Sequence, residues 1–464
     1  MENGKRGTFK GSFGFVLAAA GSAVGLGNIW RFPYLAARDG GGLFVVVYLV
    51  LVLTFGFALL TTEIVFGRKT KQSPLTAYKK LSEKWGWIGI LSCLVPFIIM
   101  PYYSVIGGWV LKYFVVFLTG HGADAAEDGF FTGFITAQWE PIIYMLIFLF
   151  VCAFVIFKGV EGGIERFSRV LMPILLVMVV GIAVFSLTIK NTGDDGKVVT
   201  GLQGLGVYLI PNLDGIGVID FLRVVMDALG QLFFSLSIAM GIMIAYGSYV
   251  PDEANLVKSI NQIEFFDTFV ALLAGVMIIP AVFVFMGKDA MSAGPSLIFI
   301  SLPKIFVAMG PIGNVIGAIF FAMVLFAAVT SAMSIMEAVV SSLMDQFHLS
   351  RNASTSVETV LALVLAVIVC LGYNVLYFEY QLPNGATAQI LDIMDYISNS
   401  VLMPLIALFT CILAGWVLKP QTIIDEATRN GEHFNRRGLY IVMVKFVAPA
   451  LLVVLFLISV GIIK

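Results

Sequence analysis

Apolar segments of about 20 residues recur along the whole chain and limit its fold more than any other feature of the sequence. A helix rises about 1.5 Å per residue, so about 20 apolar residues cross a hydrocarbon core about 30 Å thick. Only 12% of the 464 residues are charged, against about a quarter in an ordinary soluble domain. The sequence therefore predicts an all-α polytopic membrane protein.

We expect eleven membrane-spanning helices. Their approximate bounds are 12–37, 42–67, 87–118, 140–157, 164–189, 219–249, 257–287, 311–345, 356–374, 387–416 and 439–463. No linker rich in proline, serine or charge divides the chain, so residues 1–464 are expected to form a single membrane domain in contact with lipid.

The charges between the spans indicate the orientation. The loop after the second span holds Arg68, Lys69, Lys71, Lys79, Lys80 and Lys84 against one acid, Glu83. The next loop holds Asp124, Glu127 and Asp128. Basic loops stay on the cytoplasmic side, so we expect a cytoplasmic amino terminus, a carboxyl terminus outside or in the periplasm, and the cell (inner) membrane as the location.

Two of the expected spans contain residues that interrupt a helix. The first holds Gly21, Gly25 and Gly27, and the sixth holds Ser235, Ser237 and Gly241. Backbone groups freed in hydrocarbon cost several kcal/mol each unless a ligand or water bonds them, so a break predicts a binding site. Small residues at these spacings also serve close helix packing, which is the alternative interpretation of the glycines.

The two interrupted spans are five spans apart. Because five is odd, residues 12–189 and 219–416 would form two five-helix halves of opposite orientation, the inverted-repeat plan of many secondary transporters. Residues 439–463 would then add an eleventh helix.

Asn28 and Arg31 lie inside the first apolar span, where polar and charged groups are costly and usually functional. Arg31 needs an anionic partner, and Asp395 in the tenth span is predicted at a similar depth on the outer side. A purely structural ion pair is the alternative.

The run from Ala20 to Tyr34, AGSAVGLGNIWRFPY, closely resembles the first-helix signature of the neurotransmitter:sodium symporter family. The resemblance covers essentially the whole chain and includes Gly40-Gly41-Gly42, the run from Gln231 to Ser237, and Thr330-Ser331. It implies the leucine-transporter-type fold with discontinuous helices 1 and 6, and sodium-coupled import by alternating access. Eleven spans resemble the bacterial amino-acid branch of the family.

The resemblance also implies two Na⁺ sites beside the unwound first helix. The first would use the Ala23 carbonyl, Asn28, Ser235 and Asp267, with the substrate carboxylate as a further ligand. The second would use the carbonyls of Gly21, Val24 and Ala327 with the hydroxyls of Thr330 and Ser331. Hard cations prefer such oxygen ligands, although hydroxyls in membrane helices commonly bond their own backbone.

Asp267 departs from many animal members of the family, which have Asn at this position and need chloride. A fixed carboxylate in a low-dielectric site can offset the sodium charge, so we expect no chloride requirement. The alternative is a solvated acid near the start of the seventh span.

Gly25 stands where the family's monoamine carriers have an Asp, so the ligand should bring its own carboxylate. The resemblance places that carboxylate at the amides of Leu26 and Gly27, beside the Tyr103 hydroxyl. The ammonium group would lie near Ala23, Phe234 and Ser237. The pocket for the side chain would be lined by Ile99, Tyr103, Phe234, Met240 and Ile335, with Ser331 nearby. These groups carry no charge, so we expect a hydrophobic amino acid, and the adaptable Met240 slightly favours an aromatic one.

Gates are expected on both sides of the site. Outside, Arg31 with Asp395 and the lid Phe234 would close over the substrate. Inside, Arg6 with Asp345, supported by Ser248 and Tyr249, resembles the family's cytoplasmic gate. Gly163 and Pro173 have the spacing by which this family can unwind the fifth helix.

Other functions are less well supported by the sequence. No basic face suggests nucleic acid, and the three histidines and four cysteines form no typical metal-ligand spacing. No nucleophile, base and metal constellation suggests an enzyme. A proton-coupled or uncoupled amino-acid carrier on the same fold, and a channel or transport-like sensor, remain the alternatives.

Overall fold

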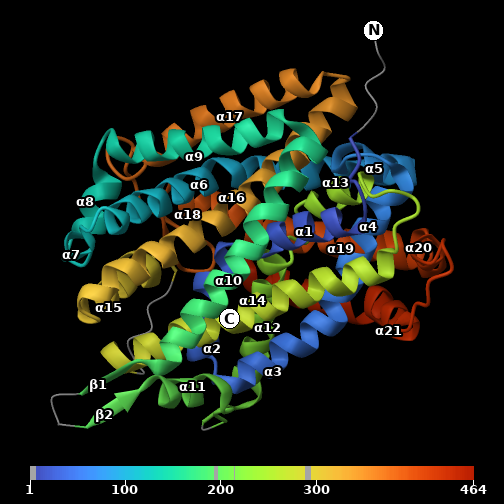
Figure 1. Cartoon of the computed structure of the whole chain (residues 1–464). Helices are drawn as coiled ribbons and strands as arrows, with labels where there is room; N and C mark the ends of the chain where they lie inside the picture. The colour runs from blue at the N-terminus through green and yellow to red at the C-terminus, as the bar shows by residue number, and fades with distance from the viewer. Residues whose placement is uncertain (1–6, 193–196, 214, 288–293, 464) are drawn as a thin grey trace.

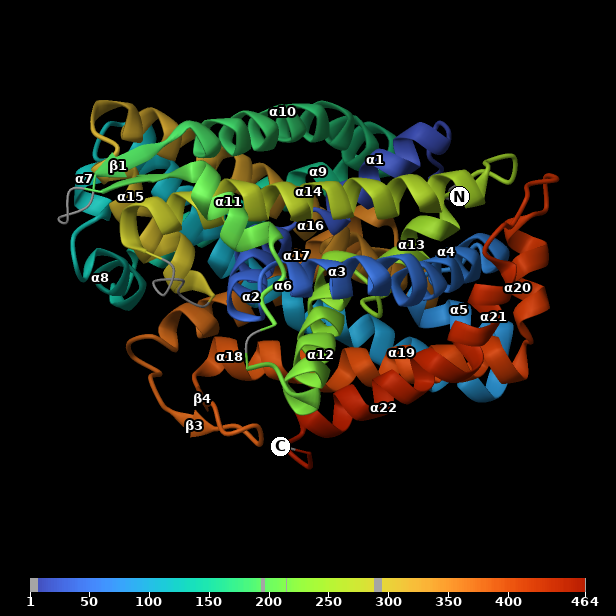
Figure 2. The same ribbon diagram turned by 90° about the horizontal axis from the view of Figure 1, so that it is seen from below.

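The structure, a computed structural model, describes residues 7–192, 197–213, 215–287 and 294–463, which are mostly helical. Two small hairpins pair β1 (Lys190–Thr192) with β2 (Val198–Thr200) and β3 (Tyr380–Gln381) with β4 (Thr387–Ala388), both antiparallel. Figure 1 shows long helices packed side by side, with short helices and the β1–β2 hairpin at the end of the bundle, and Figure 2 shows the β3–β4 hairpin.

The helices of the first half follow the chain from the first broken span to the fifth span. They are α1 (Ser12–Ala23), α2 (Phe32–Arg38), α3 (Gly42–Leu51), α4 (Phe57–Thr70), α5 (Pro74–Leu81), α6 (Gly86–Leu118), α7 (Gly122–Ala125), α8 (Phe130–Thr136), α9 (Glu140–Phe157) and α10 (Arg166–Thr188). π-helical turns at Gly27–Arg31, Val52–Gly56 and Val160–Glu165 continue into α2, α4 and α10.

The second half begins with the short helix α11, which the second broken span follows. Its helices are α11 (Gly201–Leu209), α12 (Val218–Ser235), α13 (Ile242–Ser248), α14 (Leu256–Met286), α15 (Leu302–Ala308), α16 (Pro311–Phe347), α17 (Arg351–Leu371), α18 (Ile390–Asp395), α19 (Met403–Ile412), α20 (Pro420–Ala427), α21 (Arg437–Val442) and α22 (Ala448–Ser459). Further π-helical turns lie at Leu297–Ser301, Tyr396–Leu402, Leu413–Val417 and Met443–Val447.

Within the described residues, nine continuous helices are long and apolar enough to cross a membrane, and the pair Ser12–Ala23 and Gly27–Arg38, bent by 52°, makes a tenth candidate. The sixth expected span is divided into α12, which carries three charged residues, and α13, which has 7 residues, so neither piece is by itself a long apolar span. The polytopic fold with an interrupted first and sixth span is present, whereas the count of eleven spans and the inverted repeat stay predictions.

The interrupted spans lie at the centre of the packing. α1 packs against α10, α14 and α16, and α13 packs against α4. Figure 2 shows α14 running along the bundle beside α10, with α16 beneath it and α19 and α22 on the opposite side. Helices distant in sequence therefore enclose both breaks.

Two predicted spans begin earlier than expected. The fifth is helical from Val160, because Gly159 at φ 83 lets the chain turn after α9 and restart. The ninth begins at Arg351, where the Ser350 hydroxyl caps the helix by accepting from the Ala353 N–H at 3.2 Å. The short helices α5, α7, α8, α11, α15 and α20 lie in regions expected to be loops.

Candidate functional site

The first helix breaks where the glycines predicted it. α1 ends at Ala23, helical structure resumes at Gly27, and oxygens near the break receive hydrogen bonds from other helices. The Ser22 carbonyl accepts from Ser331 Oγ at 3.0 Å and from Ser237 Oγ at 3.1 Å. The Gly27 carbonyl accepts from Gln231 Nε2 at 3.1 Å. Side chains of the sixth and eighth spans thus stabilise the broken first span.

The sixth span breaks between Ser235 and Ile242. Ser237 and Ala239, neither of them glycine, have φ of 52° and 62°, a strained region that the surroundings must stabilise. Glu63 of α4, which is fully buried, accepts the Ala239 N–H at 2.8 Å. Glu63 was not among the predicted site residues, although an acid inside an apolar span is a signal that could have identified it.

Asp267 connects the residues predicted for the first sodium site. Its Oδ1 accepts from Asn28 Nδ2 at 2.7 Å and from Ser235 Oγ at 2.8 Å. Tyr48 OH lies 3.1 Å from Ser235 Oγ and 3.4 Å from Asp267 Oδ2. Asp267 is 0% exposed, so the alternative of a solvated acid at the helix end is wrong. Ala23, the remaining predicted member, is buried at the end of α1.

The residues predicted for the second sodium site lie where α1 meets α16. Ser331 Oγ is 3.5 Å from the Gly21 carbonyl, and a methyl group on Gly21 would lie 3.4 Å from the Thr330 Cβ. Thr330 Oγ1 donates to the carbonyls of Phe326 and Ala327, at 3.0 and 3.1 Å. Val24 and Ala327 are fully buried. Oxygens from two helices are therefore close together here.

An unpartnered oxygen supports a fit to Na⁺ at the first site. Asn28 Oδ1 is buried and has no hydrogen-bond partner in the part of the chain that the structure describes. It belongs to the same side chain that contacts the Asp267 carboxylate. Carboxylate, amide and hydroxyl oxygens are ligands that a hard cation prefers, so these residues could hold sodium.

A small cavity lies beside the two breaks. Its volume is about 20 Å³, room for roughly one water molecule. It is lined by the predicted Ile99, Tyr103, Phe234, Ser237, Met240, Ser331 and Ile335, and also by Ser22 and Gly25. Ala23, Leu26 and Gly27 lie at the adjacent break and do not line it. An amino acid would enter only if side chains such as Phe234 moved.

An outer cavity of about 190 Å³ adjoins this one, and Tyr103 and Phe234 line both. Arg31 and Asp395 also line the outer cavity, but among the ion pairs of the described residues none joins them. Asp395 Oδ1 instead accepts from Asn399 Nδ2 at 2.5 Å and from Tyr102 OH at 3.2 Å. The predicted direct pair is therefore not formed in this structure, and both side chains line the outer cavity instead.

The inner gate is only partly described, because Arg6 lies outside the described residues. Asp345 accepts the Ser73 N–H at 2.6 Å. Ser248 and Tyr249 are buried at the end of α13. These positions place three of the four predicted gate residues near the ends of α13 and α16.

The Tyr249 hydroxyl contacts a buried ion pair that was not predicted from the sequence. Its hydroxyl lies 2.5 Å from Glu337, and Arg351 binds both Glu337 oxygens at 2.7 and 2.8 Å. The signal in the sequence was again an acid, Glu337, inside an apolar span.

The fifth helix is wound in this structure. Gly163 lies in the π-helical turn Val160–Glu165, and Pro173 lies inside α10. A methyl group on Gly163 would come within 2.1 Å of the Val155 carbonyl. The turn therefore needs glycine at this position, and its unwinding stays a prediction.

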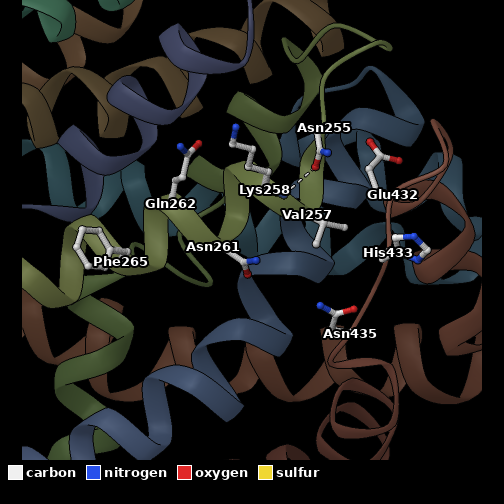
Figure 3. A pocket seen from close by; sticks show the side chains of 9 residues that line it. All are labelled: Asn255, Val257, Lys258, Asn261, Gln262, Phe265, Glu432, His433 and Asn435. Atoms are coloured by element: carbon white, nitrogen blue, oxygen red, sulfur yellow. Dashed lines mark hydrogen bonds between the residues drawn. The ribbon is translucent and has the colours of Figure 1, made fainter.

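A groove of about 370 Å³ lies away from these residues, between the start of α14 and the loop before α21. Figure 3 shows Lys258 and Gln262 on the side of α14 away from His433 and Asn435. Asn255 caps the helix by accepting the Lys258 N–H at 2.8 Å. The groove shares no residue with the predicted sodium or substrate sites.

Known proteins are similar to this chain over almost its whole length. A sequence profile of the sodium:neurotransmitter symporter family matches residues 6–124 and 131–464. The chain belongs to this sodium:neurotransmitter symporter family. It is therefore a multi-pass membrane transporter of a family that moves small molecules with sodium.

Individual symporters of the family are similar over most of their length. The uncharacterized sodium-dependent transporter YhdH of Bacillus subtilis is 33% identical, with 97% of each chain covered. The human sodium- and chloride-dependent GABA transporter 2 is 27% identical, over 91% of this chain and 75% of its own. The crystal structure of MhsT in complex with L-phenylalanine matches with a TM-score of 0.85 and 32% identity, over 98% of this chain and all of the other.

Proposed function

We propose that this symporter imports a hydrophobic amino acid, aromatic ones included, by alternating access and independently of chloride. The observation that carries the proposal is the chemistry of the central cavity. Its lining contains no charged side chain, and the Tyr103 hydroxyl is buried without a hydrogen-bond partner in the described structure. Tyr103 OH is available for a substrate carboxylate, and Gly25 leaves room for it.

The size and apolarity of the lining residues support a hydrophobic side chain. Ile99, Met240 and Ile335 present hydrocarbon or thioether surface, and a thioether adapts its shape readily. The match to MhsT, whose crystal structure contains L-phenylalanine, favours an aromatic substrate.

Two sodium ions are proposed as the coupling ions, at the two oxygen clusters beside the first helix. Asp267 supplies the negative charge in the first cluster, and Ser331 joins the second cluster to the substrate cavity. A carboxylate among the sodium ligands removes the need for a separate anion to offset the ion's charge. Chloride independence follows from this carboxylate.

Arg31, Asp395 and Phe234 are proposed as the outer gate, and Arg6 with Asp345 as the inner one. The proposed orientation puts the amino terminus in the cytoplasm, the carboxyl terminus outside and the chain in the inner membrane. The basic loop after the second span supports this orientation. Residues 12–189 and 219–416 are proposed as inverted repeats.

The test is uptake of labelled phenylalanine into proteoliposomes, with each unlabelled amino acid as a competitor. Hydrophobic and aromatic amino acids should compete, whereas acidic and basic ones should not, because the cavity holds no countercharge. Sodium should be required and gluconate should replace chloride without effect. Uptake that continues in choline and follows pH instead would establish the proton-coupled alternative, and absence of saturable counterflow would indicate a channel or sensor.

A further inference from the structure

Glu358, in the third turn of α17, is a buried acid without a partner among the described residues. It is 0% exposed. Neither of its carboxylate oxygens has a hydrogen bond, and no ion pair reaches it from any residue that the structure describes. An ionised carboxylate taken from water into the protein interior is strongly destabilising unless a positive charge or several donors compensate it. Some group must therefore neutralise Glu358.

Two hydroxyl residues lie one helical turn before Glu358 on the same face. Ser354 and Thr355 are both 0% exposed, and both hydroxyls lack hydrogen-bond partners among the described residues. Side chains three and four residues apart are neighbours on a helix. Hydroxyls in such helices commonly bond the carbonyl four residues back, as Thr359 does to Thr355 at 2.7 Å. Ser354 and Thr355 make no such bond to any described residue, so the O–H group and the lone pairs of each hydroxyl are both unused.

Other helices seal this part of α17 from solvent and lipid. α17 packs against α6, α9 and α16, and Figure 1 shows α17 alongside α9 at one side of the bundle. Cys93 of α6 lies near both Glu358 and Ser342 of α16. Ser342 Oγ donates to the Ala338 carbonyl at 2.7 Å. Neither Cys93 nor Ser342 carries a positive charge that could offset the charge of Glu358.

We propose that Glu358, Ser354 and Thr355 form a binding site for one sodium ion between α17, α6 and α16. One carboxylate balances the charge of one monovalent cation, whereas divalent cations usually need several anionic ligands. A proton on Glu358 would use only one of the two carboxylate oxygens and one hydroxyl as its acceptor. A sodium ion can be coordinated by the carboxylate and both hydroxyls together.

This site is separate from the two proposed transport sites. Those lie beside the breaks in the first and sixth spans and use residues of α1, α12, α14 and α16. Glu358 belongs to α17, which is an unbroken helix. We therefore expect its ion to stabilise the packing of α17 and to stay bound while substrate is transported.

The test is equilibrium binding of radioactive sodium to the purified full chain, with choline keeping the ionic strength constant. E358Q removes the charge with little change of shape, and it should bind one fewer sodium ion per chain at saturation. Its sodium-dependent rise in melting temperature should also be smaller. Equal sodium stoichiometry in E358Q and the unmodified chain would overturn the proposal and leave a protonated acid or buried water at this position.

Hydroxyl variants keep the proposal testable if E358Q fails to fold. T355A keeps the carboxylate, and its sodium affinity at this site should fall about tenfold or more, since even outer-shell partners of metal sites have effects of this size. T359A is the matched control, because the Thr359 hydroxyl already bonds its own backbone. Equal sodium affinity in T355A and T359A would contradict the site.

Discussion

Asn28 donates from Nδ2 to Asp267 Oδ1 at 2.7 Å, while its side-chain Oδ1 is buried and has no hydrogen-bond partner among the described residues. Ser235 Oγ bonds the same carboxylate. Residues of the first, sixth and seventh spans thus meet at the Asp267 carboxylate. The Asn28 Oδ1 atom beside it has free lone pairs. A cation bound here would couple the two broken spans to α14.

Replacing Asp267 by Asn should make transport depend on chloride. The substitution keeps the size of the side chain but removes the charge that offsets sodium, so an external anion would have to replace it. Uptake by D267N should need a higher sodium concentration and should fall when gluconate replaces chloride. D128N, which changes an exposed loop acid, is the control. If uptake by D267N does not change with chloride and keeps its normal sodium dependence, Asp267 does not supply the charge that offsets sodium.

Gly25 should tolerate no added methyl group. A Cβ there would lie 2.7 Å from Ser331 Oγ and 3.4 Å from the Tyr103 hydroxyl. G25A should weaken apparent affinity for phenylalanine about 10- to 200-fold, the usual effect of one methylene in a fitted pocket. G181A is the matched control, because a Cβ at that helical glycine meets nothing within 4 Å. Similar half-saturation concentrations for G25A and G181A would exclude this placement of the substrate.

S331A should raise the sodium concentration needed for uptake by about tenfold, the loss typical of a metal-site contact. The hydroxyl belongs to the oxygen cluster proposed as the second sodium site, and it bonds the Ser22 carbonyl at 3.0 Å. Sodium titrations of uptake measure the effect. S104A removes another buried hydroxyl, which bonds only the Met100 carbonyl among the described residues, and should leave the titration unchanged. A sodium dependence that is the same in S331A and S104A would count against the second site.

The buried pair of Arg351 and Glu337 should matter far more for stability than the exposed pair of Lys304 and Asp128. The Glu337 side chain is 0% exposed, whereas Asp128 is 91% exposed. R351M leaves a buried carboxylate unpaired and should cost about 3–5 kcal/mol, whereas K304M should cost about 0–1 kcal/mol. Thermal unfolding in detergent measures both. Equal melting temperatures for R351M and K304M would show that the buried pair contributes no more to stability than the exposed one.

The breaks in the membrane spans could be predicted because they depend on residues close together in sequence. Gly21, Gly25 and Gly27 interrupt one apolar run, and Ser235 to Gly241 interrupt another. Asp267 was assigned through resemblance to a family. Its contacts with Asn28 and Ser235 join three different spans, and no local pattern specifies such a meeting.

The partners of other buried charges could not be predicted for the same reason. Glu63 and Glu337 each stand inside an apolar span, but the groups that bond them, the Ala239 N–H and the Arg351 guanidinium, belong to other elements. Arg31 and Asp395 were matched by depth alone. Depth does not specify which side chains meet, and Asp395 bonds Asn399 and Tyr102 instead of Arg31.

Sodium coupling is tested by accumulation of phenylalanine in proteoliposomes against its own gradient, driven by inward sodium with an interior-negative potential. Each sodium ion contributes about 2.3 kcal/mol per 100 mV, and a thousandfold gradient requires about 4.1 kcal/mol, so two ions suffice at 100 mV even without a sodium gradient. We expect concentrative uptake that collapses when sodium is equal on both sides and the potential is removed, and that is unchanged by gluconate in place of chloride. Accumulation that persists after sodium is replaced by choline would show that transport is not coupled to sodium.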